Sequence, residues 1–242
     1  MRDTFRVVGN PVTKGILIVA DHASNHVPDD IDLGLAGERL ETHIALDIGV
    51  APVAEYMAEN SGIAAILAIN SRLIVDLNRD AGEAGVIPLV SDGIKIAGNA
   101  ISPAERIARL DRFYHPYHAE VARLIREYRP QLLLSLHSFT PQLASNPKEA
   151  RPWDIGVLYN EDDRAARLAL PMLAKYGLNA GDQLPYSGKL LNATMNRHGE
   201  GSGTPYLGIE MRQDLAANSS GQKRFASILT DICHKITEKL GQ

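Results

Sequence analysis

Residues 15–28 read GILIVADHASNHVP. A short, uninterrupted apolar run such as the one that opens this stretch is typical of a strand buried on both faces of a sheet. The run stops abruptly at Asp21 and His22, and the polar segment that follows is closed by Pro28. The stretch therefore predicts an internal strand whose carboxyl end leads into a polar loop containing histidine.

Comparable apolar runs recur along the chain and alternate with segments of helical periodicity. We expect further strands at residues 63–69, 73–77, 132–136, 155–159 and 206–211. We expect helices at residues 42–60, 102–129, 162–176 and 221–240, where apolar residues recur at helical spacing. This alternation implies a mostly parallel, mixed sheet with helices on both faces. Because no repeat or linker interrupts the pattern, we predict a single α/β domain over residues 1–242.

The helix at residues 102–129 has the clearest start signal. Ser102 and Glu105 form a capping-box pattern, with Pro103 at the first helical position. Pro116 lies inside the predicted helix and should kink it. We expect one apolar stripe along this helix, formed by Ile107, Leu110, Tyr114, Tyr117, Val121, Leu124 and Ile125.

Composition restricts the possible functions. With 25 basic and 29 acidic residues, the chain has a net charge of -4 and no concentrated basic segment, which argues against a nucleic-acid partner. No apolar stretch approaches the roughly 20 residues needed to cross a bilayer, and the first residues lack a signal-peptide pattern. We therefore expect a cytoplasmic protein. Cys233 is the only cysteine, so no intrachain disulfide is possible and any metal would be held by histidines and carboxylates.

Three polar residues lie at or near the ends of predicted strands, namely His22, His137 and Glu210. In open parallel sheets, ligands bind outside the carboxyl ends of the strands. A lone histidine is most simply a hydrogen-bonded residue near the surface, but two histidines and a carboxylate at one sheet edge favour a metal site. Catalytic zinc usually takes three protein ligands and leaves a fourth position for water.

The third ligand has several candidates, which are Asp21, Asn25, His26, His43 and Asp47. An amide oxygen such as that of Asn25 is a poor zinc ligand beside a carboxylate. Asp47 follows His43 by four residues, so both would project to the same side of a helix. Asp47 also interrupts an apolar segment, where an unpaired charge is costly unless a cation compensates it. An exposed position on the helix is an equally good interpretation of Asp47.

A second polar cluster surrounds the run at residues 73–77. Arg72, Asn78 and Arg79 could hold an anion, since a guanidinium matches a carboxylate with two hydrogen bonds. A local salt-bridge network is the simpler alternative, because Asp76 and Asp80 are available partners.

Taken together, these motifs resemble the N-formylglutamate amidohydrolase family. The resemblance spans residues 15–213 in the expected order. The pieces that carry it are Asp21-His22, Asp47, Ser71-Arg72, Asp76-Leu77-Asn78-Arg79, Tyr117-His118, Leu136-His137-Ser138, Pro185-Tyr186-Ser187-Gly188, Gly208-Ile209-Glu210 and Arg212. The Asp-Leu-Asn-Arg and Leu-His-Ser pieces are the most specific.

The resemblance implies a zinc-carboxypeptidase-like or aspartoacylase-like hydrolase fold and a Zn²⁺ or another divalent transition metal. It implies that His22, His137 and Asp47 bind the metal, with Asn25 as the weaker alternative to Asp47. Glu210 would be the general base, and Arg72 would also be catalytic. The residues implied to bind the substrate are Arg72, Asn78, Arg79, His118, Tyr186 and Arg212. The implied substrate is a small anionic N-acyl amino acid, and the implied reaction converts N-formylglutamate to formate and glutamate, a step of histidine breakdown.

Two alternatives stay open. The same residues could act on another N-acyl amino acid or a small peptide. Because Asn25 stands where the wider group has a glutamate ligand, the chain could also be a catalytically silent binding protein. Residues 82–101 show the least structure by sequence, and they could form a flap over the site.

Overall fold

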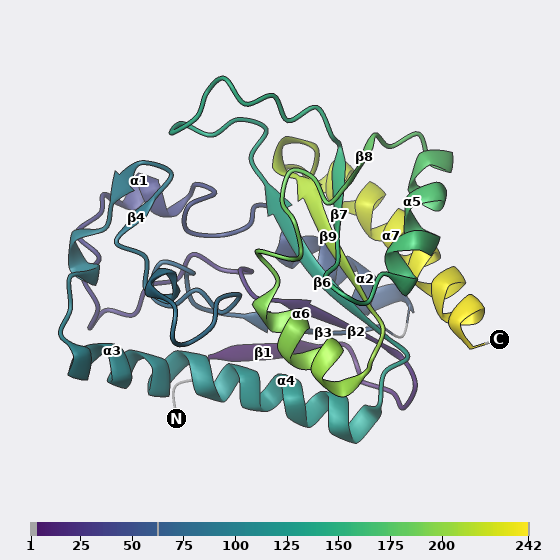
Figure 1. Cartoon of the computed structure of the whole chain (residues 1–242), viewed down its shortest axis with the longest axis horizontal. Helices are drawn as coiled ribbons and strands as arrows, with labels where there is room; N and C mark the ends of the chain where they lie inside the picture. Colours follow the sequence, from purple (N-terminus) through teal and green to yellow (C-terminus); the bar gives the residue numbers. More distant parts are fainter. Residues whose placement is uncertain (1–3, 62, 242) are drawn as a thin grey trace.

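A seven-stranded sheet forms the centre of the computed structural model, which describes residues 4–61 and 63–241 (Figure 1). The strands follow one another across the sheet in the order β1, β3, β2, β6, β9, β7 and β8. Their bounds are β1 Phe5–Val8, β2 Ile16–Ala20, β3 Ala64–Ala68, β6 Leu132–Phe139, β7 Ile155–Leu158, β8 Ala180–Asp182 and β9 Tyr206–Arg212. The neighbours β3, β2, β6 and β9 run parallel, whereas β1 and β7 are antiparallel to β3 and β9. The sheet is therefore mixed and mostly parallel, as the sequence predicts.

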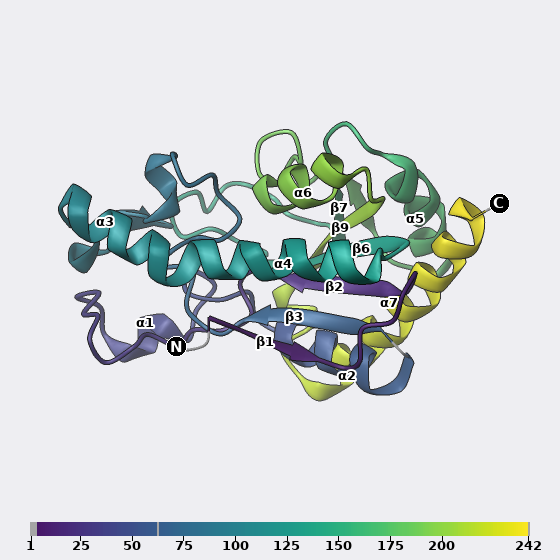
Figure 2. The same ribbon diagram turned by 90° about the horizontal axis from the view of Figure 1, so that it is seen from below.

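Helices cover both faces of the sheet (Figure 2). On one face α2, α7 and α5 pack side by side, and on the other α4 lies against α6. The helices are α1 Gly37–Leu40, α2 Val50–Ser61, α3 Pro103–Arg109, α4 His115–Tyr128, α5 Arg164–Lys175, α6 Ala193–His198 and α7 Ser219–Leu240. Every residue of β2, β3 and β6 is buried between these layers, which confirms the internal strands that the apolar runs predict. No helix within the described residues is long and apolar enough to span a membrane.

The helix predicted at residues 102–129 is confirmed as one unbroken helical run from Pro103 to Tyr128, with a change of helix type inside it. Its capping box is present, since the Ser102 side chain accepts from the Glu105 amide and Glu105 accepts from the Ser102 amide. A π-helical turn at Leu110–Tyr114 separates α3 from α4 and places Pro116 in the first turn of α4, where its missing N–H costs little. Because the wider turn rotates the apolar stripe, Ile107 is 60% exposed although the periodicity predicts it to be buried.

The helix predicted at residues 42–60 begins only at Val50, and the segment before it forms turns. Gly49 explains the late start, because its φ of +88° lies in the left-handed region, which interrupts a right-handed helix. A Cβ at Gly49 would lie 2.5 Å from the Ala216 carbonyl oxygen, so the position requires glycine. Consequently Asp47 lies in a turn, where its N–H donates to the His22 carbonyl (2.9 Å). The prediction that His43 and Asp47 share one face of a helix was wrong.

The strand predicted at residues 73–77 was also wrong. The segment is buried, but its N–H groups bond within its own turn or to another loop and not to a neighbouring strand: Ile74 donates to Ser71 and Asp76 donates to Val86. The buried Asn99 side chain bonds the carbonyls of Leu73 and Pro88 and so satisfies this irregular backbone. An apolar run therefore marked burial here without marking a strand.

Residues 82–101 are more regular than the sequence indicates. They contain the hairpin of β4 (Val90–Ser91) and β5 (Ile94–Lys95), and they bury Val86, Ile87 and Ile96. The hairpin lies beyond the carboxyl ends of the central strands (Figure 1). Sequence patterns missed this hairpin, together with β1, β8, α1 and α6, which are all short elements.

Candidate functional site

The carboxyl ends of β2, β6 and β9 meet at a cavity of about 300 Å³. His22 follows β2, while His137 on β6 and Glu210 on β9 are direct neighbours in the register of the two strands. Parallel topology brings these three together because it places strand ends of distant sequence at one edge. Eight predicted site residues line the cavity: His22, Asp47, Arg72, Asn78, Arg79, His137, Tyr186 and Glu210.

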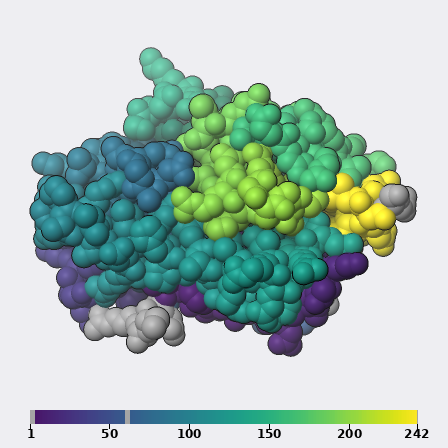
Figure 3. Space-filling model, turned by 60° about the horizontal axis from the view of Figure 1, so that its bottom comes forward, coloured from purple at the N-terminus to yellow at the C-terminus, as the bar shows by residue number. Residues whose placement is uncertain are grey.

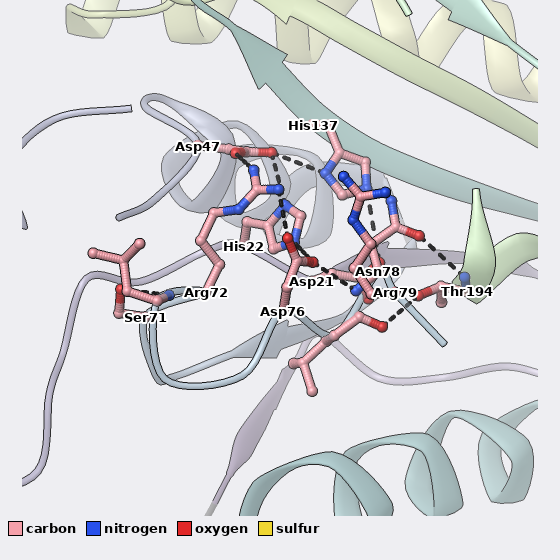
Figure 4. A network of polar contacts seen from close by, with 12 residues as sticks. Asp21, His22, Asp47, Ser71, Arg72, Asp76, Asn78, Arg79, His137 and Thr194 are labelled. Carbon is pink, nitrogen blue, oxygen red and sulfur yellow. Dashed lines mark hydrogen bonds and ion pairs between the residues drawn. The ribbon is translucent and has the colours of Figure 1, made fainter. Parts of the chain in front are cut away.

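His22, Asp47 and His137 form a compact, buried group at the base of this cavity (Figure 4). One candidate ligand atom from each residue can be chosen so that all three lie within 4.8 Å of one another. Asp47 Oδ2 lies 2.8 Å from His137 Nδ1 and 3.3 Å from His22 Nδ1. Two imidazoles and a carboxylate are the donor types that catalytic zinc takes, so the group fits a divalent transition metal.

The outer nitrogens of both imidazoles face further carboxylates. His22 Nε2 lies 2.8 Å from Asp76 Oδ1, and His137 Nε2 lies 3.7 Å from Asp21 Oδ2. Asp21 is itself held by the Tyr117 hydroxyl, which donates to its Oδ1 (2.8 Å). In proteins, histidines that bind a metal typically donate their other N–H to a carboxylate, which fixes the ring for ligation. Both rings are therefore oriented with Nδ1 toward Asp47.

Charge balance in the site also favours a cation. Asp21, Asp47, Asp76 and Glu210 are all buried. Arg72 is the guanidinium that pairs with this group in the described part of the chain, and it donates to Asp47 Oδ1 (3.2 Å) and Asp76 Oδ2 (2.7 Å). Buried carboxylates are costly unless cations compensate them. A divalent ion held by His22, His137 and Asp47 would compensate the remaining negative charge.

The pKa shifts have the same origin. Burial and Arg72 oppose protonation of His22, but Asp76 and Asp47 outweigh them and raise its pKa to about 9. Burial disfavours the charged form of Asp47, yet His22, His137 and Arg72 hold its pKa well below the usual value. Burial likewise opposes the charged form of His137, but Asp47 raises its pKa. The site thus stabilises positive charge at the imidazoles, the position that a metal ion would occupy.

Glu210 differs from the other carboxylates. Burial raises the pKa of Glu210 to about 7, although His137 opposes the shift. Its Oε2 is buried without a hydrogen-bond partner among the described residues. A carboxyl group that is poorly compensated and adjacent to His137 is suited to accept and release a proton.

Asn78 and Arg79 line the cavity from the irregular loop after Leu77. The Asn78 side-chain oxygen accepts from the Thr194 amide (3.0 Å) at the start of α6 (Figure 4). The Arg79 guanidinium lies 3.9 Å from the exposed Glu83, a loose pairing that leaves it able to bind an anion. The ion pair between Arg72 and Asp76 confirms the local salt bridge considered for this segment, and it is part of the site as well.

Three of the predicted site residues do not reach the cavity. Asn25 donates its side-chain N–H to Glu41 (3.0 Å), away from the cluster of His22, Asp47 and His137. His118 is buried under the loop, where its Nε2 bonds the Leu77 carbonyl (3.0 Å). The Arg212 guanidinium pairs with Asp214 and Asp154 at the surface. The structure places these three side chains outside the cavity lining, where each bonds other residues that do not line the cavity.

Sequence reasoning also missed contributions to the site. Asp76 was considered only as a partner of Arg72, although it also faces the outer nitrogen of His22. Sequence patterns did not identify Arg151, because it lies in an irregular polar segment without a recognisable motif. The structure buries its guanidinium and bonds it to the Tyr186 hydroxyl (2.9 Å). His43, considered as a ligand, lines the cavity and pairs with Asp92 (3.0 Å).

Comparison with known proteins shows related sequences and folds. A family model described as N-formylglutamate amidohydrolase matches residues 14–217. The structure is similar to gene product Atu2144 from Agrobacterium tumefaciens, with a TM-score of 0.92 and 28% identity over 99% of this chain and 96% of that one. It shares its fold with N-formylglutamate amidohydrolase from Ralstonia eutropha JMP134, with a TM-score of 0.68 and 20% identity over 98% of this chain and 97% of that one. No curated protein matches the sequence.

Proposed function

The chain belongs to the N-formylglutamate amidohydrolase family, and from this premise we propose a metal-dependent hydrolase that removes the formyl group from an acidic N-formyl amino acid. N-formylglutamate and water would give formate and glutamate. The observation that carries the proposal is the buried group of His22, Asp47 and His137 in one cavity with Glu210 and two guanidinium groups.

His22, His137 and Asp47 would hold the metal, and zinc is the ion that their donor atoms suit best. When bound, such an ion lowers the pKa of water towards 7 and polarises an acyl oxygen. Asp76 and Asp21 would keep the two imidazoles oriented through their outer nitrogens. Arg72 would hold Asp47 and Asp76 in place and would add positive charge beside the reacting acyl group.

Glu210 would act as the general base. Its carboxylate would accept a proton from water while the water oxygen adds to the formyl carbon. It would then pass that proton to the nitrogen as the C–N bond breaks, so that a neutral amine and formic acid form, and the acid then loses its proton to the amine to give formate. The raised pKa of Glu210 and its unpaired Oε2 support this assignment.

Asn78 and Arg79 would bind a carboxylate of the amino acid. Arg79 offers a planar guanidinium in the cavity, and Asn78 is fixed by the Thr194 amide. Fixing the substrate at this end orients its amide toward Glu210 and thereby lowers the entropic part of the barrier.

A panel of N-formyl and N-acetyl amino acids, assayed for acid release with and without a chelator, tests the proposal. We expect release from N-formylglutamate that the chelator abolishes and added Zn²⁺ restores. Faster release from another N-acyl amino acid or a small peptide would keep the chemistry and change the substrate. Binding of these compounds without release, at any divalent metal supplied, would indicate a silent binding protein.

A further inference from the structure

The turn that carries Tyr186 packs directly against the sheet next to Glu210. Gly156 on β7 is the register partner of Glu210, and a Cβ at Gly156 would lie 2.4 Å from the Leu184 carbonyl oxygen and 3.3 Å from Glu210 Cβ. A Cβ at Gly188 would likewise lie 2.3 Å from the Tyr159 carbonyl oxygen. Only glycine at these positions lets the turn approach the strand so closely, and the approach brings Tyr186 into the wall of the cavity near Glu210.

Arg151 donates a hydrogen bond to the Tyr186 phenol and does not itself line the cavity. Its side chain is 2% exposed, and one of its terminal nitrogens donates to the Tyr186 oxygen (2.9 Å) and, at 3.4 Å, to the Thr140 carbonyl. The guanidinium carbon lies 5.0 Å from the centre of the Tyr186 ring, and Nε donates to Glu149 (2.9 Å). Of the two residues, Tyr186 lines the cavity and Arg151 does not.

The direction of this hydrogen bond decides what Tyr186 can do. A guanidinium can only donate, so the Tyr186 oxygen accepts from Arg151 and its own O–H remains available to the cavity. Burial raises the pKa of Tyr186, so the phenol keeps its proton. The two terminal nitrogens of Arg72 already donate to Asp47 and Asp76. Tyr186 is therefore a half-buried, uncharged donor in the same cavity wall as Glu210.

We propose that Tyr186 is a catalytic residue that donates a hydrogen bond to the oxyanion formed on the acyl oxygen, and that Arg151 is its positioning residue. The assignment rests on the proposed amide hydrolysis. As the water oxygen bonds to the acyl carbon and Glu210 takes its proton, the π electrons of the carbonyl move to its oxygen. That oxygen accepts from the Tyr186 hydroxyl until the C–N bond breaks and the carbonyl reforms. A donor already held in place stabilises this charge without reorganisation.

Kinetics of matched variants test the assignment. Tyr186→Phe removes one hydroxyl and should lower kcat about tenfold to a hundredfold with KM changed less than about twofold and metal content unchanged. Arg151→Gln should lower kcat in the native background but add little to Tyr186→Phe, and Arg151→Lys should recover part of the loss. Tyr176→Phe, which removes an exposed phenol bonded to Asp231, is the control and should be silent. A Tyr186→Phe enzyme with native kcat, or additive losses in the double variant, would overturn the proposal.

Binding provides a readout that does not depend on turnover. Phosphonomethyl-pentanedioate carries a tetrahedral anion in place of the formyl group of N-formylglutamate, and carboxymethyl-pentanedioate carries a planar one. By calorimetry, Tyr186→Phe should weaken the phosphonate about tenfold and the planar carboxylate less than about threefold. If the wild type fails to hydrolyse N-formylglutamate but this selective loss appears, the substrate is wrong and the role of Tyr186 stands. Equal affinities of the wild type and the Tyr186→Phe variant for the phosphonate would exclude that role. Failure of the phosphonate to bind either protein would also exclude it.

Discussion

Two pairs of buried histidines contact the loop at residues 73–79, one through Asp76 and one through the Leu77 carbonyl, and only the first forms a candidate metal group within the described residues. The rings of His22 and His137 are 4.9 Å apart at 61°, and those of His118 and His198 are stacked 5.2 Å apart at 17°. The first pair is surrounded by Asp47, Asp76 and Asp21, whereas the second pair bonds internally (2.9 Å) and to the Leu77 carbonyl. Proximity of imidazoles is therefore not sufficient for a metal site, which also needs ring nitrogens with free electron pairs and a third donor, here the Asp47 carboxylate.

The second pair has its tautomers determined by its partners. Because the Leu77 carbonyl can only accept, His118 carries its proton on Nε2, and its Nδ1 accepts from His198. Burial lowers the pKa of His118 to about 3 and that of His198 to about 4, so both rings are neutral. The pair joins α4 to α6, which lie against each other at the surface (Figure 3), and holds the loop that carries Asn78. We therefore expect this pair to support the cavity wall.

Removing one histidine from each pair gives the largest expected difference. His137→Ala should lose the metal and, with it, several kcal/mol of transition-state stabilisation, which is about a thousandfold or more in rate. His198→Gln should retain the metal and lose only stability. Elemental analysis and formate release, with circular dichroism as a check on folding, measure both. Full activity of His137→Ala would exclude this residue as a ligand.

The Asp47 carboxylate, which bonds both His22 and His137, distinguishes this pair chemically from His118 and His198. Asp47→Asn should reduce bound metal to a small fraction of the native content, because a neutral amide replaces the anionic ligand. Asn25→Ala should leave metal content unchanged, since Asn25 bonds Glu41 away from the site. The reverse outcome, with metal lost only from Asn25→Ala, would transfer the third ligand to Asn25.

Glu210 is adjacent to the first pair but should not be needed for metal binding. Glu210→Gln should keep the metal and slow kcat by about a hundredfold or more, the scale of lost general-base catalysis. Metal titration and steady-state kinetics separate the two effects. If KM alone changed, Glu210 would be reassigned to substrate binding.

The neutral pair should make stability depend on pH. An unfolded histidine has a pKa of about 6.5, so below that pH the unfolded chain binds protons that folded His118 and His198 exclude. Their contribution is complete above pH 6.5 and should fall as the pH is lowered toward about 4, by about 2 kcal/mol per histidine at pH 5. Urea unfolding of the protein in chelator, compared with His118→Asn, measures this effect. An identical pH slope in the variant would contradict the neutral assignment.

Local pattern was sufficient for much of the architecture. Long apolar runs predicted β2, β3, β6 and β9, because a strand buried on both faces must be apolar throughout. The same runs placed His22, His137 and Glu210 at one sheet edge, since parallel strands share a carboxyl edge. Periodicity could not show that residues 73–77 form a buried loop, because burial alone produces the same apolar run.

The sequence by itself determined the central strands, the polar residues that follow or end them and, through the family resemblance, Asp47 as the carboxylate proposed to bind the metal. The tertiary structure alone decided which histidine pair bonds Asp47, that Asp76 bonds the outer nitrogen of His22, and that Arg151 bonds Tyr186. The physical reason is separation along the chain. A strand or helix is encoded by neighbouring residues, whereas the partner of a buried charge comes from whichever distant loop packs against it, and no local periodicity records that choice.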